Sequence, residues 1–493
     1  MNSQKWIPFG IVLCLCVFTI RSSPSLTPIP TFTPVTTLTP QQIYEDLDQF
    51  QTELEGRFAY LKVIDARYKA AIRSIRTEAA SGMTLDEFGL ELQKVLALFI
   101  DCHSGISGYS TPEGSLPFQM EPVENRVIAF WMDRSGFLDP AFPFITKIDG
   151  KSLAEWEQII KLVLPKGSPQ FVKTRVLYHL QSIQFARSLA GLKTSGDVSV
   201  ELETEDGASR TELSLPVSPG TASSQVWPAS QSHIMEGNIG YLRITGWGAA
   251  AFAEVADWMP RFPGTRGLIV DIRHNPGGTR NVLRELFPYF VGPTDPPHVA
   301  GAAKYKLYKD FGPDHLDYRN MHTQDWHGWT PAESTAIAEF MMTFDPEWDP
   351  PDGEFSGWHF WVVSKLSKLD AYTYNNPVIF LMDGKCFSAS DVILSSVKGV
   401  RNITLIGTPS GGGSGAFITT TLKNSGLTLR LSSMASFQNT GSLFDSRGVL
   451  PDILMEPPPG YFLQGGPDPV LERAVQIILN TEPQNIKRSK IKR

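Results

Sequence analysis

A serine stands at a position suited to chemistry in the segment LMDGKCFSASDVIL. The pattern predicts a buried strand, a turn and then a helix that starts at Ser388. A hydroxyl placed there lies at the carboxyl end of a sheet, beside the free N–H groups and the positive dipole end of the helix. Such a serine is suited to nucleophilic attack. Serine is also a common N-cap residue, so helix capping alone would explain it too.

Two further segments carry groups that would serve such a nucleophile. DIRHNPGG ends in Gly277 and Gly278 after an apolar run, and their N–H groups could bind an oxyanion. A tight strand-to-helix turn would need the same glycines. FIDCHSGISGY contains His103, whose imidazole titrates near neutrality and suits a general base. A lone histidine is more often a polar loop residue, and the fourth segment, DSRGVLPDI with Asp445, has the composition of a turn.

Other chemistries lack their sequence signatures. Ser414 stands in GGSGA and not in a G-x-S-x-G elbow, which argues against an α/β-hydrolase. The segment SGGGSG lacks the Lys-Ser/Thr of a P-loop. The histidines of residues 294–372 show no ligand spacing such as H-E-x-x-H. We therefore predict neither a metal nor another cofactor.

The composition and the ends of the chain indicate an extracellular protein. Its 493 residues suffice for roughly two to four domains, and a net charge of −7 disfavours nucleic-acid binding. The apolar stretch within residues 1–23 indicates a signal peptide, and a signal anchor is the alternative. Residues 24–40 are a Thr/Pro-rich linker. The sequon at Asn402 fits glycosylation of a secreted protein, and the mature chain would keep two of its four cysteines, Cys102 and Cys386.

The elements that must position these residues follow from periodicity. We expect helices in residues 41–117, one of them starting with a capping box at Thr84 and ending before His103. Residues 118–220 predict short strands, including a hairpin across Asp206-Gly207. From residue 231 to 460, apolar strands alternate with helices, which is typical of a parallel α/β sheet. The Trp-rich insertion 294–372 shows little periodicity and is either a cap over the cleft or a satellite core.

Together and in this order, the four segments resemble the tail-specific (C-terminal processing) serine protease family over most of residues 41–460. FPFITKIDGKSL resembles the family's PDZ-like unit. Four further segments resemble the core motifs of the family: GLIVDIRHNPGG, DGKCFSASDVIL, LIGTPSGGGSG and SRGVLPDI. The resemblance implies an α/β core of the ClpP/crotonase-like ββα type over 231–460. It also implies a helical N-terminal region over 41–117, a small PDZ-like β-rich domain over 118–220, and a C-terminal helix and basic tail over 461–493.

The resemblance also assigns roles to residues. The family's nucleophile falls on Ser388, whereas the lysine base of the bacterial processing proteases falls on Gly413, so the Ser-Lys version is not supported. The chain is more similar to the Ser-His branch, which includes the tricorn core and the chlamydial protease-like activity factor. The histidine of that branch falls on His103 and its glutamate on Asp445. The oxyanion donors implied are the N–H groups of Gly277, Gly278 and Ala389.

The leading hypothesis is a secreted serine endopeptidase that cleaves protein or peptide substrates through a Ser388 acyl-enzyme, with His103 as general base. A catalytically inactive, secreted peptide-binding homologue is the alternative. A crotonase-type acyl-CoA enzyme is disfavoured, because CoA is intracellular. If His103 and Ser388 meet, Cys102 and Cys386 come close as well, and a disulfide between them across the site is a further hypothesis.

Overall fold

The computed structural model describes residues 36–62, 67–220, 231–365 and 372–481. The predicted signal peptide, residues 24–35 of the predicted Thr/Pro-rich linker and the basic tail lie outside these residues, whereas the last linker residues belong to a short strand and the start of a helix. From Thr37 onward the chain forms one compact unit. Within the described ranges, no helix combines the length and the apolar character needed to cross a membrane.

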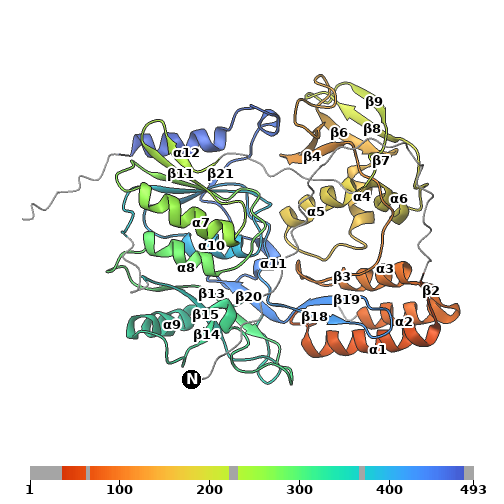
Figure 1. Ribbon diagram of the computed structural model, residues 1–493, viewed down its shortest axis with the longest axis horizontal. Helices are drawn as coiled ribbons and strands as arrows, with labels where there is room; N and C mark the ends of the chain where they lie inside the picture. Colours follow the sequence, from red (N-terminus) through yellow and green to blue (C-terminus); the bar gives the residue numbers. More distant parts are fainter. Residues whose placement is uncertain (1–35, 63–66, 221–230, 366–371, 482–493) are drawn as a thin grey trace, which may run out of the picture. The chain divides into compact units, whose positions relative to one another are not determined.

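A six-stranded sheet with the order β10-β11-β12-β16-β17-β21 organises the α/β part (Figure 1). Five neighbouring strands are parallel, and β10 at one edge is antiparallel. The strands span His233–Met235 (β10), Ile239–Arg243 (β11), Leu268–Asp271 (β12), Val378–Met382 (β16), Ile403–Gly407 (β17) and Ile453–Leu454 (β21). The inner strands are mostly apolar because helices cover both of their faces, as the sequence predicted.

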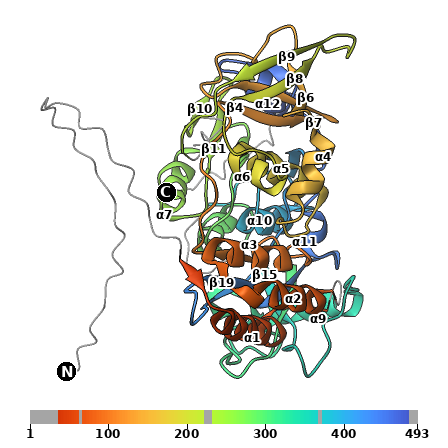
Figure 2. The ribbon, with the colours of Figure 1, turned by 90° about the vertical axis from the view of Figure 1, so that its right-hand side faces the viewer.

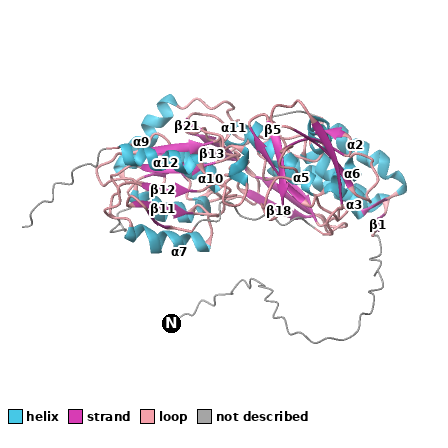
Figure 3. Ribbon diagram, turned by 90° about the horizontal axis from the view of Figure 1, so that it is seen from above, coloured by secondary structure: helices cyan, strands magenta, loops and turns pink. Residues whose placement is uncertain are grey.

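Helices on the two sides of this sheet bury alternate side chains of each strand. Leu268 and Val270 of β12 pack with α7, α8 and α10, whereas Ile269 packs with α12 on the opposite face. Figure 3 shows β11 and β12 side by side. The helices span Ala249–Trp258 (α7), Asn281–Leu286 (α8), Ala389–Val397 (α10) and Pro469–Asn480 (α12). This layering leaves the loops after the carboxyl ends of the strands free to form a site.

Three helices lie together near the start of the compact unit (Figure 2). They span Pro40–Arg57 (α1), Tyr68–Glu78 (α2) and Leu85–Leu96 (α3). The predicted capping box at Thr84 is confirmed, since its hydroxyl accepts from the Glu87 N–H and the Glu87 carboxylate accepts from the Thr84 N–H. The short strand β3 (Gly105–Ser107) then joins the edge of a hairpin formed by β18 (Phe417–Thr421) and β19 (Thr428–Ser432). This hairpin ties the N-terminal part to the core.

Residues 118–220 form a second sheet with the order β4-β5-β6-β8-β9. Its strands span Phe118–Val123 (β4), Arg126–Trp131 (β5), Phe144–Ile148 (β6), Val198–Glu203 (β8) and Arg210–Leu215 (β9), with Lys151–Ser152 (β7) beside β6. The predicted β8–β9 hairpin is confirmed. The prediction of strands and loops missed two helices, Pro169–Gln181 (α5) and Ile183–Leu189 (α6), which follow α4 (Leu153–Ile160). The start signal of α5 was present, since Ser168 caps it and proline takes the first position.

The insertion is more regular than its sequence predicted. Its strands His298–Tyr305 (β13), His322–Thr323 (β14) and His359–Val363 (β15) form a four-stranded sheet with Met434–Gln438 (β20), beside helix Pro331–Thr343 (α9). Trp361 packs into the main core, Trp329 into a smaller cluster around Phe360, and Trp358 against Phe437. These contacts favour the satellite-core interpretation. The remaining short elements are Thr37–Leu38 (β1), Met83–Thr84 (β2) and Phe444–Arg447 (α11).

A buried ion pair fixes the carboxyl end of β12. Asp271 is fully buried and accepts hydrogen bonds from Arg273 and from the Tyr241 hydroxyl at 2.7 Å. Arg273 also binds Asp468, at the start of α12. Burial alone would raise the pKa of Asp271, but the neighbouring guanidinium groups outweigh it and hold the pKa below the ordinary value.

Replacing Arg273 by leucine is therefore expected to lower the free energy of unfolding by roughly 3 kcal/mol, because Asp271 loses its main buried partner. The control is Arg261→Leu, since Arg261 pairs with Asp257 on the surface and such pairs contribute less than about 1 kcal/mol. Urea unfolding followed by circular dichroism compares the two variants. Equal losses in both would contradict this account of the ion pair.

Candidate active site

Ser388 lies in the turn between β16 and α10 and has a strained backbone. Its φ of 59° and ψ of −112° are unusual for a residue with a side chain. Gly277 packs directly against this turn, since a Cβ there would lie 2.8 Å from the Ser388 Cβ and 2.6 Å from the Phe387 carbonyl oxygen. The turn therefore presents the Ser388 hydroxyl at the carboxyl edge of the sheet, as the sequence predicted.

The structure brings His103 into contact with Ser388. The His103 Nε2 lies 3.1 Å from the Ser388 Oγ, and the imidazole stacks on the Phe387 ring with 4.8 Å between centroids. The loop that carries His103 is held by the buried Asp101 carboxylate. That carboxylate accepts hydrogen bonds from the His103 N–H at 2.9 Å and from the Ser432 hydroxyl at 2.8 Å. This geometry permits transfer of a proton from serine to imidazole.

Asp445 lies near His103 but binds other groups. Its carboxylate accepts from the Tyr60 hydroxyl at 3.0 Å and from the Cys102 N–H at 3.2 Å. Ligand atoms of Asp101, His103 and Asp445 lie within 4.8 Å of one another. No residue in the described part of the chain hydrogen bonds the buried His103 Nδ1. The structure therefore provides the serine–histidine contact without the histidine–carboxylate bond of a complete triad.

The charge states around His103 follow from its surroundings. Burial, together with the nearby Arg319 and Arg430 guanidinium groups, lowers the pKa of His103 to about 3. The imidazole is therefore neutral at neutral pH, and its Nε2 can accept a proton. Burial and the neighbouring Asp101 carboxylate raise the pKa of Asp445 to about 6.

The predicted oxyanion donors lie beside Ser388. Gly277 and Gly278 have φ values of 106° and 143°, which favour glycine. The Gly277 N–H already donates to the Asn275 Oδ1 at 2.9 Å. The Ala389 nitrogen lies next to Gly277, 3.1 Å from where a Cβ on that glycine would stand. Gly278 and Ala389 are therefore the better candidates for binding a developing oxyanion.

Two glycines make room for the imidazole. A Cβ on Gly413 would lie 2.5 Å from the Phe387 ring and 3.2 Å from the His103 Cε1. A Cβ on Gly415 would lie 2.6 Å from the Ser432 Oγ and 3.2 Å from the His103 Nδ1. A longer side chain at position 413, such as the lysine of the bacterial branch, would compete with His103 for this space.

The disulfide hypothesis is wrong, since Cys102 and Cys386 are free. The Cys386 thiol donates to the Ile272 carbonyl oxygen at 3.1 Å, whereas the Cys102 thiol points toward Lys166 and Gly167. The two thiols thus point away from the site in different directions, although His103 and Phe387, the residues that follow them, both belong to the site.

Asn402 is half-buried, and its Nδ2 donates to the carbonyl oxygens of Tyr374 and Asn376 at 3.2 and 2.8 Å. A glycan would replace one of the two hydrogens on that nitrogen and so break one of these bonds. The group Asp101–His103–Asp445 also offers little to a metal ion, because hydrogen-bond donors already occupy both carboxylates.

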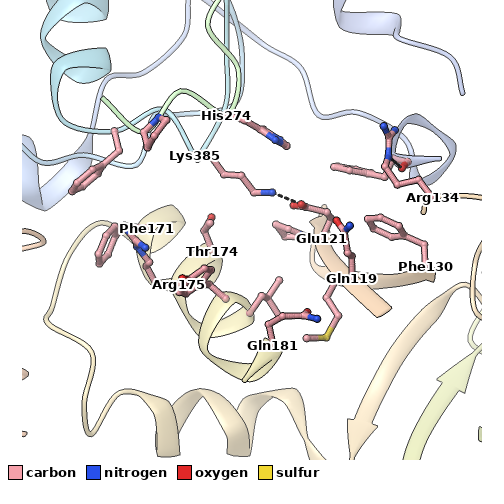
Figure 4. Close-up of a pocket in the computed structure, with 18 of the residues that line it drawn as sticks. Gln119, Glu121, Phe130, Arg134, Phe171, Thr174, Arg175, Gln181, His274 and Lys385 are labelled. Carbon is pink, nitrogen blue, oxygen red and sulfur yellow. Dashed lines mark hydrogen bonds and ion pairs between the residues drawn. The ribbon is translucent and has the colours of Figure 1, made fainter. Parts of the chain in front are cut away.

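A cavity of about 400 Å³ opens beside the site (Figure 4). It lies between the second sheet, helix α5 and the loops after β12 and β16. Phe387, adjacent to Ser388, lines it together with Phe171 and Arg175 of α5 and with Lys385. Arg175 was not among the predicted site residues, because its helix was not predicted from the sequence. The Ser-Pro start of that helix was the available signal.

Residues 238–455 match the model of Peptidase family S41. A carboxy-terminal-processing protease from Bartonella bacilliformis is 24% identical over 230 residues, which are 45% of this chain and only 40% of that protein. The crystal structure of mature CPAF shares the fold with a TM-score of 0.62 at 17% identity, over 84% of this chain and 93% of that one. The structure of mature CPAF in complex with lactacystin matches with a TM-score of 0.62 at 16% identity, over 90% of this chain and 100% of that one. Residues 238–455 are therefore similar to the S41 peptidases, and the resemblance to the tail-specific proteases is confirmed.

The low pKa of His103 predicts that its imidazole stays neutral between about pH 5 and 8, where an exposed histidine would titrate. Below pH 6.5 the unfolded chain gains a proton that the folded His103 does not accept, so its contribution to stability falls as the pH decreases. NMR of ¹³C-histidine-labelled protein, with the resonance assigned by His103→Gln, measures this. A titration midpoint near 6.5 would contradict the buried environment described for His103.

Gly413→Ala should destabilise the protein by about 1–3 kcal/mol, because the added methyl meets the Phe387 ring and the backbone conformation disfavours a side chain. Gly136→Ala is the matched control, since a Cβ there meets nothing within 4 Å. The midpoints of thermal unfolding report both. If the two variants melt alike, the tight packing around the imidazole is not real.

Proposed function

We propose that this protein is a secreted serine endopeptidase in which Ser388 is the nucleophile and His103 the general base. The observation that carries the proposal is the 3.1 Å contact between the His103 Nε2 and the Ser388 Oγ. A neutral imidazole next to a strained, half-buried serine is the arrangement that nucleophilic catalysis needs. The S41 core supports a peptide or protein as substrate.

In the proposed reaction, His103 takes the proton of Ser388 as the hydroxyl oxygen attacks a peptide carbonyl. The N–H groups of Gly278 and Ala389 then bind the oxyanion, and each such donor typically lowers the barrier by roughly 3 kcal/mol. His103 returns the proton to the leaving amine. A water molecule, deprotonated by the same imidazole, hydrolyses the acyl-enzyme.

Asp445 has an electrostatic role in this proposal. Its carboxylate lies close enough to His103 to stabilise the imidazolium that forms in the transition state. Its bonds to Tyr60 and to the Cys102 N–H hold it in place. Asp445 has a shorter side chain than the glutamate of the Ser-His branch. This is consistent with an electrostatic effect on the imidazolium that acts through space and not through a hydrogen bond.

Residues 118–220 serve in this proposal as a PDZ-like domain that guides the peptide toward Ser388. Support comes from the cavity that this domain shares with the core, lined by Gln119 and Met120 on one side and by Pro276 and Phe387 on the other. Secretion is proposed from the sequence of residues 1–23.

An inactive, secreted peptide-binding homologue is the second candidate. One observation favours it, namely that the His103 Nδ1 has no hydrogen-bond partner among the described residues. Without such a partner, the imidazole tautomer is not fixed and the base is weaker.

A fluorophosphonate probe separates the two candidates. The wild-type protein and the control Ser135→Ala, which removes an exposed hydroxyl, should both be labelled, whereas Ser388→Ala should not. Intact-protein mass spectrometry reads the adduct. A folded wild-type protein that takes up no label would leave the peptide-binding candidate in its place.

His103→Ala should abolish turnover of a peptide substrate, by about a thousandfold or more, while the protein still folds. Circular dichroism and thermal unfolding report folding independently of activity. Turnover within a few-fold of wild type would move the general base to another residue.

A further inference from the structure

Arg175 is a cation without an acidic partner inside the cavity beside Ser388. Its side chain is half-buried on α5, and no described residue gives it a hydrogen bond or an ion pair. The guanidinium instead faces aromatic rings, at 5.4 Å from the Phe171 centroid, 5.7 Å from Tyr178 and 5.9 Å from Phe387. Burial accordingly lowers its pKa. A half-buried charge of this kind gains much from a carboxylate ligand.

The other charges of the cavity do not neutralise Arg175. Its one carboxylate, Glu121, is bonded to Lys385 (Figure 4). His274 pairs with Asp383 at 3.2 Å, and the Arg134 Nε donates to the Phe462 carbonyl oxygen at 2.6 Å. The cavity therefore keeps an excess of positive charge.

Three more arginines near His103 also have no carboxylate partner among the described residues. The Arg430 Nε donates to the His103 carbonyl oxygen at 2.7 Å. Arg280 is 3% exposed and donates to the Ser414 hydroxyl at 2.8 Å, and the buried Nε atoms of Arg280 and Arg319 find no partner. These guanidinium groups add positive charge near His103, where Asp101 and Asp445 supply the carboxylates, and the cavity itself favours negatively charged ligands.

We propose that the cavity is a specificity subsite for an acidic side chain of the substrate, glutamate or aspartate, whose carboxylate binds the Arg175 guanidinium. Phe387 connects this subsite to the reaction, since it lines the cavity and directly precedes Ser388. The Phe171 and Tyr178 rings would contact the methylene groups of the acidic residue and exclude water from the ion pair. This inference rests on the proposed function, because it names the substrate of the same site.

Peptide binding tests the subsite without requiring catalysis. Ser388→Ala protein is titrated with fluorescein-labelled alanine–leucine peptides that carry one Glu, Gln or Lys at each position in turn and have an amidated C-terminus. We expect Glu peptides to bind about tenfold or more tightly than Gln peptides at one position, with a preference that weakens as salt is added. Equal binding of Glu and Gln peptides at every position would overturn the inference.

Arg175→Gln in the same background should remove the preference for Glu over Gln. The control Lys173→Gln removes the same charge from the same helix but lies outside the lining of this cavity, and it should keep the preference. A preference that survives Arg175→Gln would assign the acidic residue to another site. A second set of peptides has a free C-terminal carboxylate. If Arg175 increased the binding of these peptides but not of the amidated Glu peptides, the cavity would bind a chain end and not an acidic side chain.

Turnover and labelling keep the two proposals apart. With Ser388 present, Arg175→Gln should lower kcat/KM for the Glu peptide toward that for the Gln peptide, and Ser388 should still take up the fluorophosphonate label. Absent labelling of the wild type with a retained Glu preference would reject the protease and keep the subsite. Normal labelling without a Glu preference would do the reverse.

Discussion

The contact between His103 and Ser388 depends on the pairing of β3 with β19. The two residues are 285 positions apart in the sequence. Backbone bonds between Gly105–Ser107 and Thr428–Ser432 bring the histidine loop to the core, and Asp101 then fixes the loop through Ser432 and the His103 N–H. The two bonds to Asp101 lie in a buried environment, where an unsatisfied polar group is costly. The position of the imidazole therefore follows from the folding of the whole compact unit.

The parallel sheet supplies the other half of the site. The loops after β12 and β16 leave the same edge of the sheet, so the paired glycines and Ser388 meet without any long-range adjustment. The buried Asp271–Arg273 pair anchors the first of these loops. Gly277, which fits closely against Ser388, helps to impose the strained conformation of the serine. A rigid scaffold thus stores strain where the chemistry is proposed to occur.

Much of this could be predicted from local patterns. The apolar runs of β12 and β16 and the capping box at Thr84 are local signals, and the order of motifs located Ser388 and His103. Long-range geometry could not be predicted in this way. The Tyr60 hydroxyl that binds Asp445 and the opposite directions of the two thiols depend on tertiary packing, which leaves no periodic trace in the sequence. Helix α5 was missed because its apolar face is interrupted, although its capping serine and proline mark its start.

The space left open by Gly413 and Gly415 has a consequence for how competence is acquired. If the general base were carried on the loop that contains Gly413 and Gly415, it would fold together with the nucleophile as part of the core. An imidazole that enters this space from the N-terminal part makes the base and the nucleophile separate contributions from distant regions. An isolated fragment of residues 238–455 would contain the serine but not its proposed partner. The reaction would thus have a built-in assembly check, in which a truncated or half-folded chain stays harmless to the proteins around it.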